Sequence, residues 1–410
     1  MAMTMTYDEF KALHLSIDMT RGKPAAAQLD LSLDLIEAAP SVGYRSRDGI
    51  DCRNYGHVLG LPEAREFGAQ LLGVPAEQVV AAGNSSLELM HDALAFGMLH
   101  GMPGGEAWRR ANEVAFLCPV PGYDRHFAIC EALGIRMIAV PMNDDGPDME
   151  KVEALVAADP AIKGIWCTPL YSNPTGAIYS RGCVDRLARM PTAAPDFRLF
   201  WDDAYRFHHL TDERYASPDI LTACARAGHP DRALVFASTS KVTFAGGGIA
   251  MLAASPANIA WWQRHNGVRT IGPDKLNQLR HVRYLRDRAT LERLMERHRA
   301  ILQPKFDALD ATLRALLGDV PGVSWTKPCG GYFVSLYTPD GCAKRTVELA
   351  AQAGVVLTPA GAAFPYRLDP RDRHLRIAPS CPSLGEIEQA GQAIALSLRK
   401  ALDEGARRER

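Results

Sequence analysis

Short apolar segments alternate with helical segments through the middle of the chain, and this alternation limits the fold more than any other feature. Seven segments are apolar throughout and rich in β-branched or aromatic residues, which is typical of strands buried on both faces of a sheet. Helical segments fill most of the intervals. The pattern therefore predicts an α/β fold with a mostly parallel seven-stranded sheet flanked by helices. The predicted strands are residues 79–82, 113–118, 135–140, 162–168, 197–201, 234–237 and 249–254.

The chain changes character on both sides of this region. Residues 31–39 predict a short helix, and residues 256–318 are rich in arginine and leucine at helical spacing. A smaller α/β unit follows, and 410 residues are enough for two domains. We therefore expect an N-terminal segment (1–50) that packs with the small domain, a large domain (51–300) and a small C-terminal domain (301–410).

Composition argues against several classes of protein. Charged residues make up 23% of the chain and the net charge is −1, so the sequence predicts no nucleic-acid partner. No segment is apolar over the length of a membrane span, so no membrane partner is expected. The nine cysteines are scattered without a C-x-x-C spacing, so no metal site is predicted. Together with the lack of an apolar leader, they predict free thiols in the cytoplasm.

A lysine follows the sixth predicted strand. Lys241 comes after a buried apolar run and three small hydroxyl residues, of which Ser238 is the first, and three glycines end the stretch at Gly248. A charged amine suits this place poorly, whereas glycines allow backbone to approach a ligand closely. The stretch indicates either a lysine held in a pocket for covalent chemistry with a carbonyl group, or a strand-end charge that points to solvent.

Polar residues also follow other predicted strands. Ligands of open α/β sheets bind beyond the carboxyl ends of the strands, so these residues predict a binding site at that edge. Each also has a plainer explanation as a helix cap, a turn former, a core residue or half of a structural ion pair. The residues are Asn84, Ser85 and Ser86 after the first strand, Tyr123 after the second, Asn173 after the fourth, Asp202 and Tyr205 after the fifth, and Arg376 in a later apolar segment.

The chemistry of these residue types narrows the prediction. Backbone amides and hydroxyls at the start of a helix, as at Ser85 and Ser86, bind phosphate. A buried carboxylate such as Asp202 needs a cationic partner, for example a protonated ring nitrogen. The guanidinium of Arg376 matches a carboxylate through two parallel hydrogen bonds.

In this order, the motifs resemble those of fold-type I pyridoxal-phosphate enzymes of the aspartate aminotransferase superfamily. The resemblance covers nearly the whole chain, and its details resemble the MocR-like, or type Ic aspartate aminotransferase, branch. The motifs that carry it are Arg21-Gly-Lys-Pro24, Gly83-Asn-Ser-Ser86, Tyr171-Ser-Asn-Pro-Thr-Gly176, Asp202-Asp-Ala-Tyr205, Ser238-Thr-Ser-Lys241 and Leu375-Arg-Ile-Ala-Pro379.

The resemblance implies a transaminase that uses pyridoxal 5′-phosphate in a ping-pong reaction. Lys241 would form the internal aldimine and move the proton at the substrate α-carbon, and Asp202 would keep the pyridine nitrogen protonated. Arg376 would bind the substrate α-carboxylate, near Gly22 and Asn173. The other implied cofactor contacts are Asn84, Ser85, Ser86 and Ser238 to the phosphate, Tyr123 to the ring face, Asn173 and Tyr205 to the ring hydroxyl, and Tyr55 to the phosphate of the partner subunit in a homodimer with shared active sites.

Two parts of the resemblance are incomplete. Many relatives carry an arginine eight positions after the lysine, where this chain has Ile249, and Lys275 is a candidate replacement for its charge. A dicarboxylic amino acid also needs a second cation, for which Arg21, Lys23 and Arg269 are candidates. The resemblance favours aspartate or glutamate as donor and a 2-oxo acid such as 2-oxoglutarate as acceptor.

Other interpretations stay open at this point. An alanine or aromatic transaminase, or a β-lyase, would share Lys241 and Asp202. A regulator that only senses pyridoxal phosphate would need a DNA-binding domain, and only about twenty residues precede the Arg21–Pro24 turn. The doubly wound pattern also suits a nucleotide-binding module, but no G-x-G-x-x-G or Walker lysine follows the first predicted strand.

Overall fold

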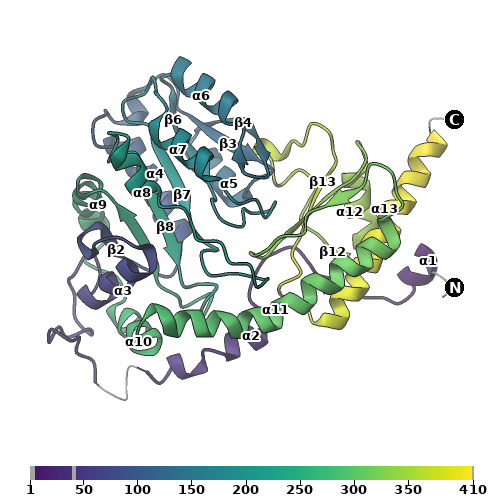
Figure 1. Cartoon of the computed structure of the whole chain (residues 1–410), viewed down its shortest axis with the longest axis horizontal. Coiled ribbons are helices and arrows are strands. Elements are labelled where there is room, and N and C mark those ends of the chain that lie inside the picture. The colour runs from purple at the N-terminus through teal and green to yellow at the C-terminus, as the bar shows by residue number, and fades with distance from the viewer. Residues whose placement is uncertain (1–4, 39–42, 409–410) are drawn as a thin grey trace.

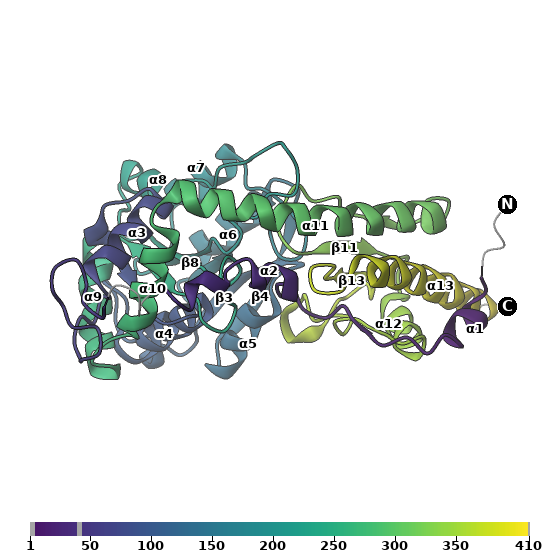
Figure 2. The same cartoon turned by 90° about the horizontal axis from the view of Figure 1, so that it is seen from below.

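The computed structural model describes residues 5–38 and 43–408, which form a larger and a smaller α/β part (Figure 1). The long helix α11 (Arg288–Leu317) runs beneath the larger part and continues into the smaller one, as the view from below also shows (Figure 2). The boundary predicted at residue 300 falls inside this unbroken helix, so the predicted domain limits remain a prediction. Among the described residues, no helix has the length and apolar character needed to cross a membrane.

The larger part is built on an eight-stranded sheet with the order β2-β9-β8-β7-β6-β3-β4-β5. The four central pairings are parallel, whereas β9 runs antiparallel to both neighbours and β5 runs antiparallel to β4. The sheet has one strand more than the seven predicted. The additional strand is β5, which has two residues and is too short to leave an apolar pattern in the sequence. The strands are β2 (Val79–Ala81), β3 (Ala115–Val120), β4 (Arg136–Asn143), β5 (Gly146–Pro147), β6 (Ile162–Cys167), β7 (Arg198–Asp202), β8 (Ala233–Ser238) and β9 (Ala250–Ala254).

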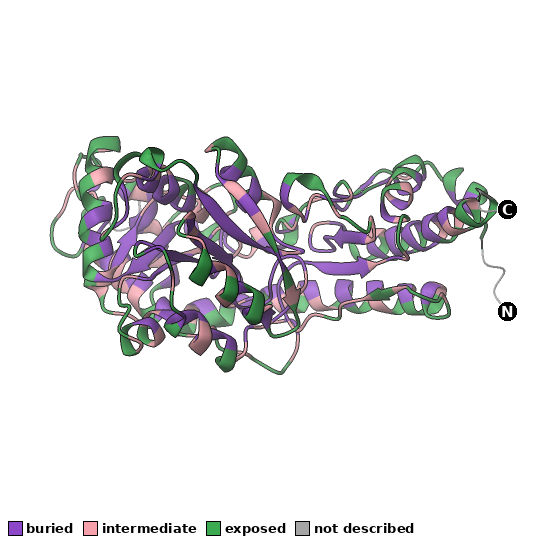
Figure 3. Cartoon of the chain, turned by 90° about the horizontal axis from the view of Figure 1, so that it is seen from above, coloured by how far each residue is buried: buried purple, intermediate pink, exposed green. Residues whose placement is uncertain are grey.

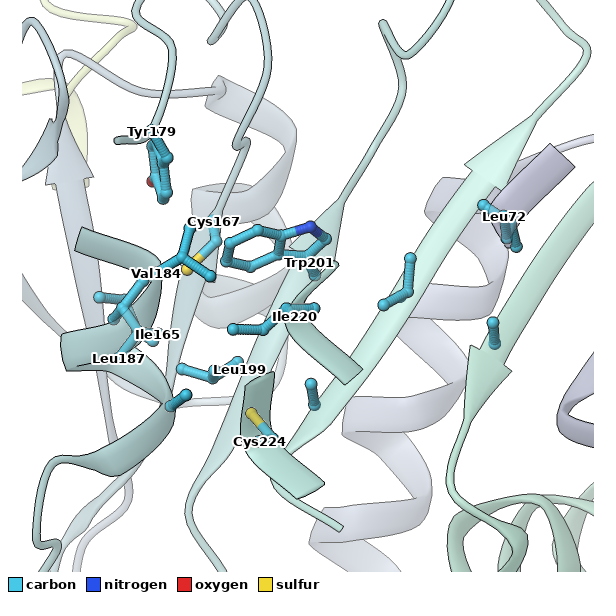
Figure 4. Packing of buried hydrophobic residues seen from close by; sticks show 14 of the residues in the cluster. Leu72, Ile165, Cys167, Tyr179, Val184, Leu187, Leu199, Trp201, Ile220 and Cys224 are labelled. Atoms are coloured by element: carbon cyan, nitrogen blue, oxygen red, sulfur yellow. The ribbon is translucent and has the colours of Figure 1, made fainter. Parts of the chain in front are cut away.

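Helices cover both faces of this sheet, and most of its strands are buried, whereas β4, next to the edge strand β5, keeps several exposed residues (Figure 3). Successive strand residues point to opposite faces, so Leu199 and Trp201 of β7 pack in one core cluster and Phe200 packs in another. Figure 4 shows the first cluster, where Val184, Leu187, Ile220 and Cys224 lie against β6 and β7. The helices are α3 (Pro62–Leu72), α4 (Ser86–His100), α5 (Asp124–Ala132), α6 (Met149–Ala158), α7 (Arg181–Arg189), α8 (Ile220–Arg226), α9 (Pro256–Arg269) and α10 (Lys275–Leu285).

The smaller part holds a three-stranded antiparallel sheet, β10 (Ser324–Trp325), β11 (Val334–Tyr337) and β13 (His374–Ile377), with α12 (Ala343–Gln352) and α13 (Leu384–Arg408). The N-terminal segment reaches it through α1 (Tyr7–Lys11) and through β1 (Ile17–Asp18), which pairs in parallel with β12 (Val355–Val356). The Tyr7 hydroxyl donates a hydrogen bond to the Leu349 carbonyl at 2.8 Å.

The prediction of a helix over residues 31–39 was wrong. The chain instead forms α2 (Ala26–Asp30) and a single 3-10 turn (Leu33–Leu35), and residue 39 lies outside the described residues. α2 lies against α11, where Gln28 is fully buried and its Nε2 lies 2.9 Å from Nδ1 of His298. At five residues, α2 is too short to leave a helical apolar periodicity in the sequence.

Candidate active site

A cavity of about 370 Å³ lies at the carboxyl ends of the parallel strands, where ligands bind in open α/β sheets. The segment that follows β1 closes one side of it, and the start of α4 forms another. The cavity brings together most of the residues predicted from the sequence. Those that line it are Gly22, Asn84, Ser85, Ser86, Tyr123, Asn173, Asp202, Tyr205, Ser238 and Lys241.

Lys241 lines the cavity just beyond the end of β8. Its Nζ lies 5.2 Å from the centroid of the Tyr205 ring. Burial disfavours the charged amine and lowers the pKa of Lys241 below its ordinary value, while the negative charge of Asp202 opposes part of this shift. The backbone carbonyl of Lys241 accepts a hydrogen bond from His208 Nε2 at 3.2 Å, which fixes the chain behind the amine. An amine with a lowered pKa is available as a nucleophile and as a base.

Asp202, the last residue of β7, is a buried carboxylate with one oxygen free. It is 4% exposed, Oδ2 lies 3.1 Å from Nε2 of His126, and Oδ1 has no partner among the described residues. His126 is itself stacked on the Trp166 ring, with the ring centroids 4.2 Å apart. A buried oxygen without a partner is costly, so Oδ1 suits a donor supplied by a ligand.

His126 is a site residue that the sequence analysis missed. It stands three residues after Tyr123, in the first turn of α5, so both side chains lie on the same face of the helix. Their rings are 4.9 Å apart in an edge-on arrangement. A histidine at this spacing from a strand-end aromatic residue was the available signal, but nothing in the sequence indicated that it would meet Asp202.

Three further polar groups face the cavity from its walls. Asn173 is 5% exposed and its Oδ1 has no partner among the described residues. Burial raises the pKa of Tyr205 well above its ordinary value, and burial with the nearby charge of Asp202 raises the pKa of Tyr123 to about 12. Both phenols therefore stay protonated and can donate hydrogen bonds.

The start of α4 offers free donors to the cavity. Ser85 is the N-cap residue, yet its side chain makes no capping hydrogen bond, so the interpretation as an ordinary cap by Ser85 is wrong. The side-chain amide of Asn84 donates to the Gly246 carbonyl at 3.2 Å instead of to the helix. The first amides of this fifteen-residue helix thus remain available for an anion, beside the hydroxyls of Ser86 and Ser238.

Residues proposed to reach or balance a phosphate from elsewhere do not line the cavity of their own chain. Tyr55 is 80% exposed and lies outside it. Lys275 is 3% exposed, and its Nζ donates to the Gly56 carbonyl at 3.2 Å. Ile249 is fully buried in the core, so its position offers no charge either.

The three candidate cations for a second carboxylate are not equivalent. Arg21 and Lys23 both line the cavity. The Lys23 amine lies 4.0 Å from an Asp18 carboxylate, whereas no ion pair of Arg21 is found within the described part of the chain. Arg269 lies outside the cavity and pairs with Glu88 and, at 2.9 Å, with Asp92.

Arg376 lies in β13 behind the cavity wall and does not line it. The side chain is 6% exposed, and its Nη1 lies 2.6 Å from Oδ1 of Asp124. The guanidinium carbon sits 5.1 Å from the centroid of the Phe333 ring. That ring also packs on Gly22, where an added Cβ would lie 2.5 Å from Phe333 Cζ, so only glycine fits while the ring keeps its place. The structural ion pair that the sequence left open for Arg376 is therefore present.

Comparisons with known proteins match this chain over nearly its full length. The family described as aspartate amino-transferase matches residues 1–408. A Mycolicibacterium smegmatis protein whose name gives an aminotransferase without a substrate is 53% identical over 393 residues, covering 95% of this chain and 92% of that protein. The crystal structure of an aspartate transaminase from Corynebacterium glutamicum superposes with a TM-score of 0.94 and 44% identity, covering 97% of this chain and 94% of that one.

A more distant structure shares the fold alone. The α-aminoadipate aminotransferase of Thermus thermophilus, complexed with N-(5′-phosphopyridoxyl)-L-leucine, superposes with a TM-score of 0.77 at 22% identity. The superposition covers 97% of this chain and 96% of the chain of that enzyme.

Proposed function

Because the chain belongs to the aspartate amino-transferase family, we propose that it transfers the amino group of aspartate to a 2-oxo acid such as 2-oxoglutarate, with glutamate as the reverse donor. Membership makes the protein an aminotransferase that uses pyridoxal phosphate. The observation that carries the proposal is the meeting of Lys241, Asp202 and Asn173 at one cavity, where buried oxygens of Asp202 and Asn173 have no partner among the described residues.

These groups fit the cofactor. Oδ1 of Asp202 would accept a hydrogen bond from its ring nitrogen, and His126 would hold the other oxygen in place. Asn173 and Tyr205 would bind the ring hydroxyl, and Tyr123 would lie on the ring face. The amides and hydroxyls at the start of α4, with Asn84, Ser85, Ser86 and Ser238, would hold the phosphate.

The reaction needs a base at the substrate α-carbon and a means to stabilise the negative charge that develops there. The bound cofactor supplies the second, as an electron-accepting ring. Lys241 would supply the first, because its lowered pKa leaves an amine free to take the α-proton and return it. Asp202 would strengthen the cofactor's effect by keeping a positive charge on the ring nitrogen. Burial of Asp202 and Tyr205 keeps water from competing for these contacts.

A donor test separates aspartate from other amino acids. With 2-oxoglutarate as acceptor, kcat/KM for aspartate is expected to exceed that for alanine and for phenylalanine by roughly 100-fold, the upper range for one hydrogen bond between charged groups. Steady-state rates with the three donors measure it. Equal values, or a preference for alanine or an aromatic donor, would contradict aspartate as the substrate.

We propose Arg21 as the cation that binds the distal carboxylate, because it lines the cavity and makes no ion pair within the described residues. Arg21→Ala is expected to raise KM for aspartate by roughly 10- to 100-fold and to leave KM for alanine unchanged, since alanine has no second carboxylate. Lys23→Ala, which removes the neighbouring cation already drawn towards Asp18, is the matched control and should change the KM for aspartate much less. A larger increase in the KM for aspartate in Lys23→Ala than in Arg21→Ala would assign the contact to Lys23.

We also propose that the enzyme is a homodimer in which Tyr55 reaches the phosphate of the partner subunit. Tyr55 and Ile271 are 80% and 60% exposed, and they lie on loops that touch, since a Cβ on Gly272 would be 2.2 Å from the Gly56 carbonyl oxygen. Exposed apolar side chains on adjoining loops fit a contact with a second copy. Sedimentation should give twice the chain mass of 44.8 kDa, and a monomer at that mass would contradict the proposal.

A cytoplasmic location is proposed from the cysteines. All nine lie within the described residues and are free thiols, as expected for a reducing compartment. Recovery of the protein from a secreted or membrane fraction of its own cells would contradict this location.

A further inference from the structure

Arg376 already holds a carboxylate, and that carboxylate belongs to its own chain. The contact of 2.6 Å between Nη1 and Oδ1 of Asp124 is a charge-assisted hydrogen bond of the kind by which arginine binds carboxylate ligands. Within the described residues, Asp124 is the one carboxylate at ion-pair distance from this guanidinium. The group proposed to bind the substrate α-carboxylate thus has a carboxylate partner within its own chain.

The remaining contacts of Arg376 are neutral. Nη2 donates to the Thr358 hydroxyl at 3.3 Å, and the Phe333 ring lies 5.1 Å from the guanidinium carbon. Nε is buried without a partner among the described residues. If Asp124 moved away and nothing replaced it, a positive charge that is 94% buried would lose the only counter-charge that the described residues place at ion-pair distance, which is strongly unfavourable.

Asp124 is placed where it could leave Arg376 without losing all its stabilisation. It is the first residue of the nine-residue helix α5, so the positive end of the helix dipole favours its negative charge. Its side chain is 32% exposed, unlike that of Arg376. It directly follows Tyr123, which lines the cavity, so a change at Asp124 occurs at the cavity wall.

We propose that Asp124 is an internal competitor of the substrate. It occupies the guanidinium of Arg376 in the empty enzyme and gives way when the α-carboxylate of an amino or oxo acid binds. The exchange keeps Arg376 neutralised in both states, and it limits affinity, because the substrate gains only the difference between two ion pairs. Both substrates carry an α-carboxylate, so the effect applies to both half-reactions. This inference rests on the proposed role of Arg376 as the α-carboxylate site.

Succinate binding to the holoenzyme, measured by calorimetry, tests the competition without turnover. Asp124→Asn keeps the shape of the side chain and removes its charge, and it is expected to lower the succinate Kd by roughly 3- to 10-fold. KM for aspartate and for 2-oxoglutarate should fall by a similar factor, with a smaller change in kcat. Glu150→Gln, which removes a charge from the first turn of α6 outside the cavity, is the matched control and should leave the Kd unchanged.

The two other results overturn the proposal. Weaker succinate binding by Asp124→Asn would mean that Asp124 only orients Arg376, and an unchanged Kd would mean that it does not compete. Asp124→Ser, which also suits the start of a helix, is measured in parallel in case the asparagine variant folds poorly.

The role of Arg376 is tested separately. Arg376→Ala should weaken succinate binding, and adding Asp124→Asn to that variant should bring no gain. If Arg376→Ala binds succinate as tightly as the wild type, the α-carboxylate site itself is wrong. That result is distinguishable from a failure of the competition, in which Arg376→Ala binds weakly and Asp124→Asn has no effect.

Discussion

Replacing Lys241 by alanine is expected to lower kcat for aspartate and 2-oxoglutarate by roughly 10⁴-fold, the upper range for loss of a positioned acid–base group. Lys241 is the residue whose amine lines the cavity beside Tyr205 and Asp202, and burial lowers its pKa so that the unprotonated form is accessible. The other lysine on the cavity wall, Lys23, lies near Asp18 and is exposed. Steady-state rates of the purified holoenzyme measure the effect.

The control is a lysine at the opposite end of the sheet. Lys163 is the second residue of β6, so it lies at the end of the strand opposite to the cavity. Its amine pairs with Asp196 at 2.8 Å. Lys163→Gln keeps a hydrogen-bond donor there and should retain kcat. A Lys241→Ala enzyme with more than about a tenth of the wild-type kcat would contradict the assignment, since even modest acid–base catalysis exceeds that factor.

Asp202→Asn should have the second-largest effect, a loss of roughly 10²- to 10³-fold in kcat, which is typical for removal of one charge-stabilising group. The amide keeps the size of the side chain and a polar contact to His126, but it loses the negative charge that would hold the ring nitrogen protonated. Without that charge the cofactor withdraws electrons less strongly from the substrate. The same steady-state assay, at saturating aspartate, measures the change.

The neighbouring residue Asp203 provides a control, because it tests whether the loss of kcat depends on the charge at Asp202 or on any negative charge close to it. Asp203 is 2% exposed and pairs with Arg206 at 2.7 Å, and as the next residue it points away from the side taken by Asp202. Asp203→Asn is expected to reduce stability by leaving Arg206 without its partner, and to keep kcat near the wild-type value. A larger loss of kcat in Asp203→Asn than in Asp202→Asn would reverse the assignment.

The site residues that could be predicted from the sequence are those that directly follow the end of a strand, because the strand places them at the edge of the sheet. Apolar runs set where β7 and β8 stop, so Asp202 and Lys241 had to arrive at the same edge of the sheet. The helix that follows β2 likewise had to start beside them, which brought Ser85 and Ser86 to the cavity. Local pattern and parallel topology together suffice for this part of the site.

Contacts between distant segments could not be predicted in this way. The ion pair of Arg376 joins residues 252 positions apart, and its partner Asp124 carries no local signal beyond the start of a helix. His126 meets Asp202 through the tertiary packing that stacks its ring on Trp166 of β6. The strand β5 and the helix α2 are too short to leave a periodic pattern, and Tyr55 is exposed and lies outside the cavity of its own chain.

The most direct test of amino transfer is a single turnover with aspartate in the absence of any 2-oxo acid. The holoenzyme is expected to release no more than one oxaloacetate per chain and no ammonia, because the amino group stays on the enzyme until an acceptor arrives. Oxaloacetate and the change in the absorption spectrum of the bound cofactor are measured together. Continuous release of pyruvate and ammonia without an acceptor would contradict the account and assign the cavity to a lyase.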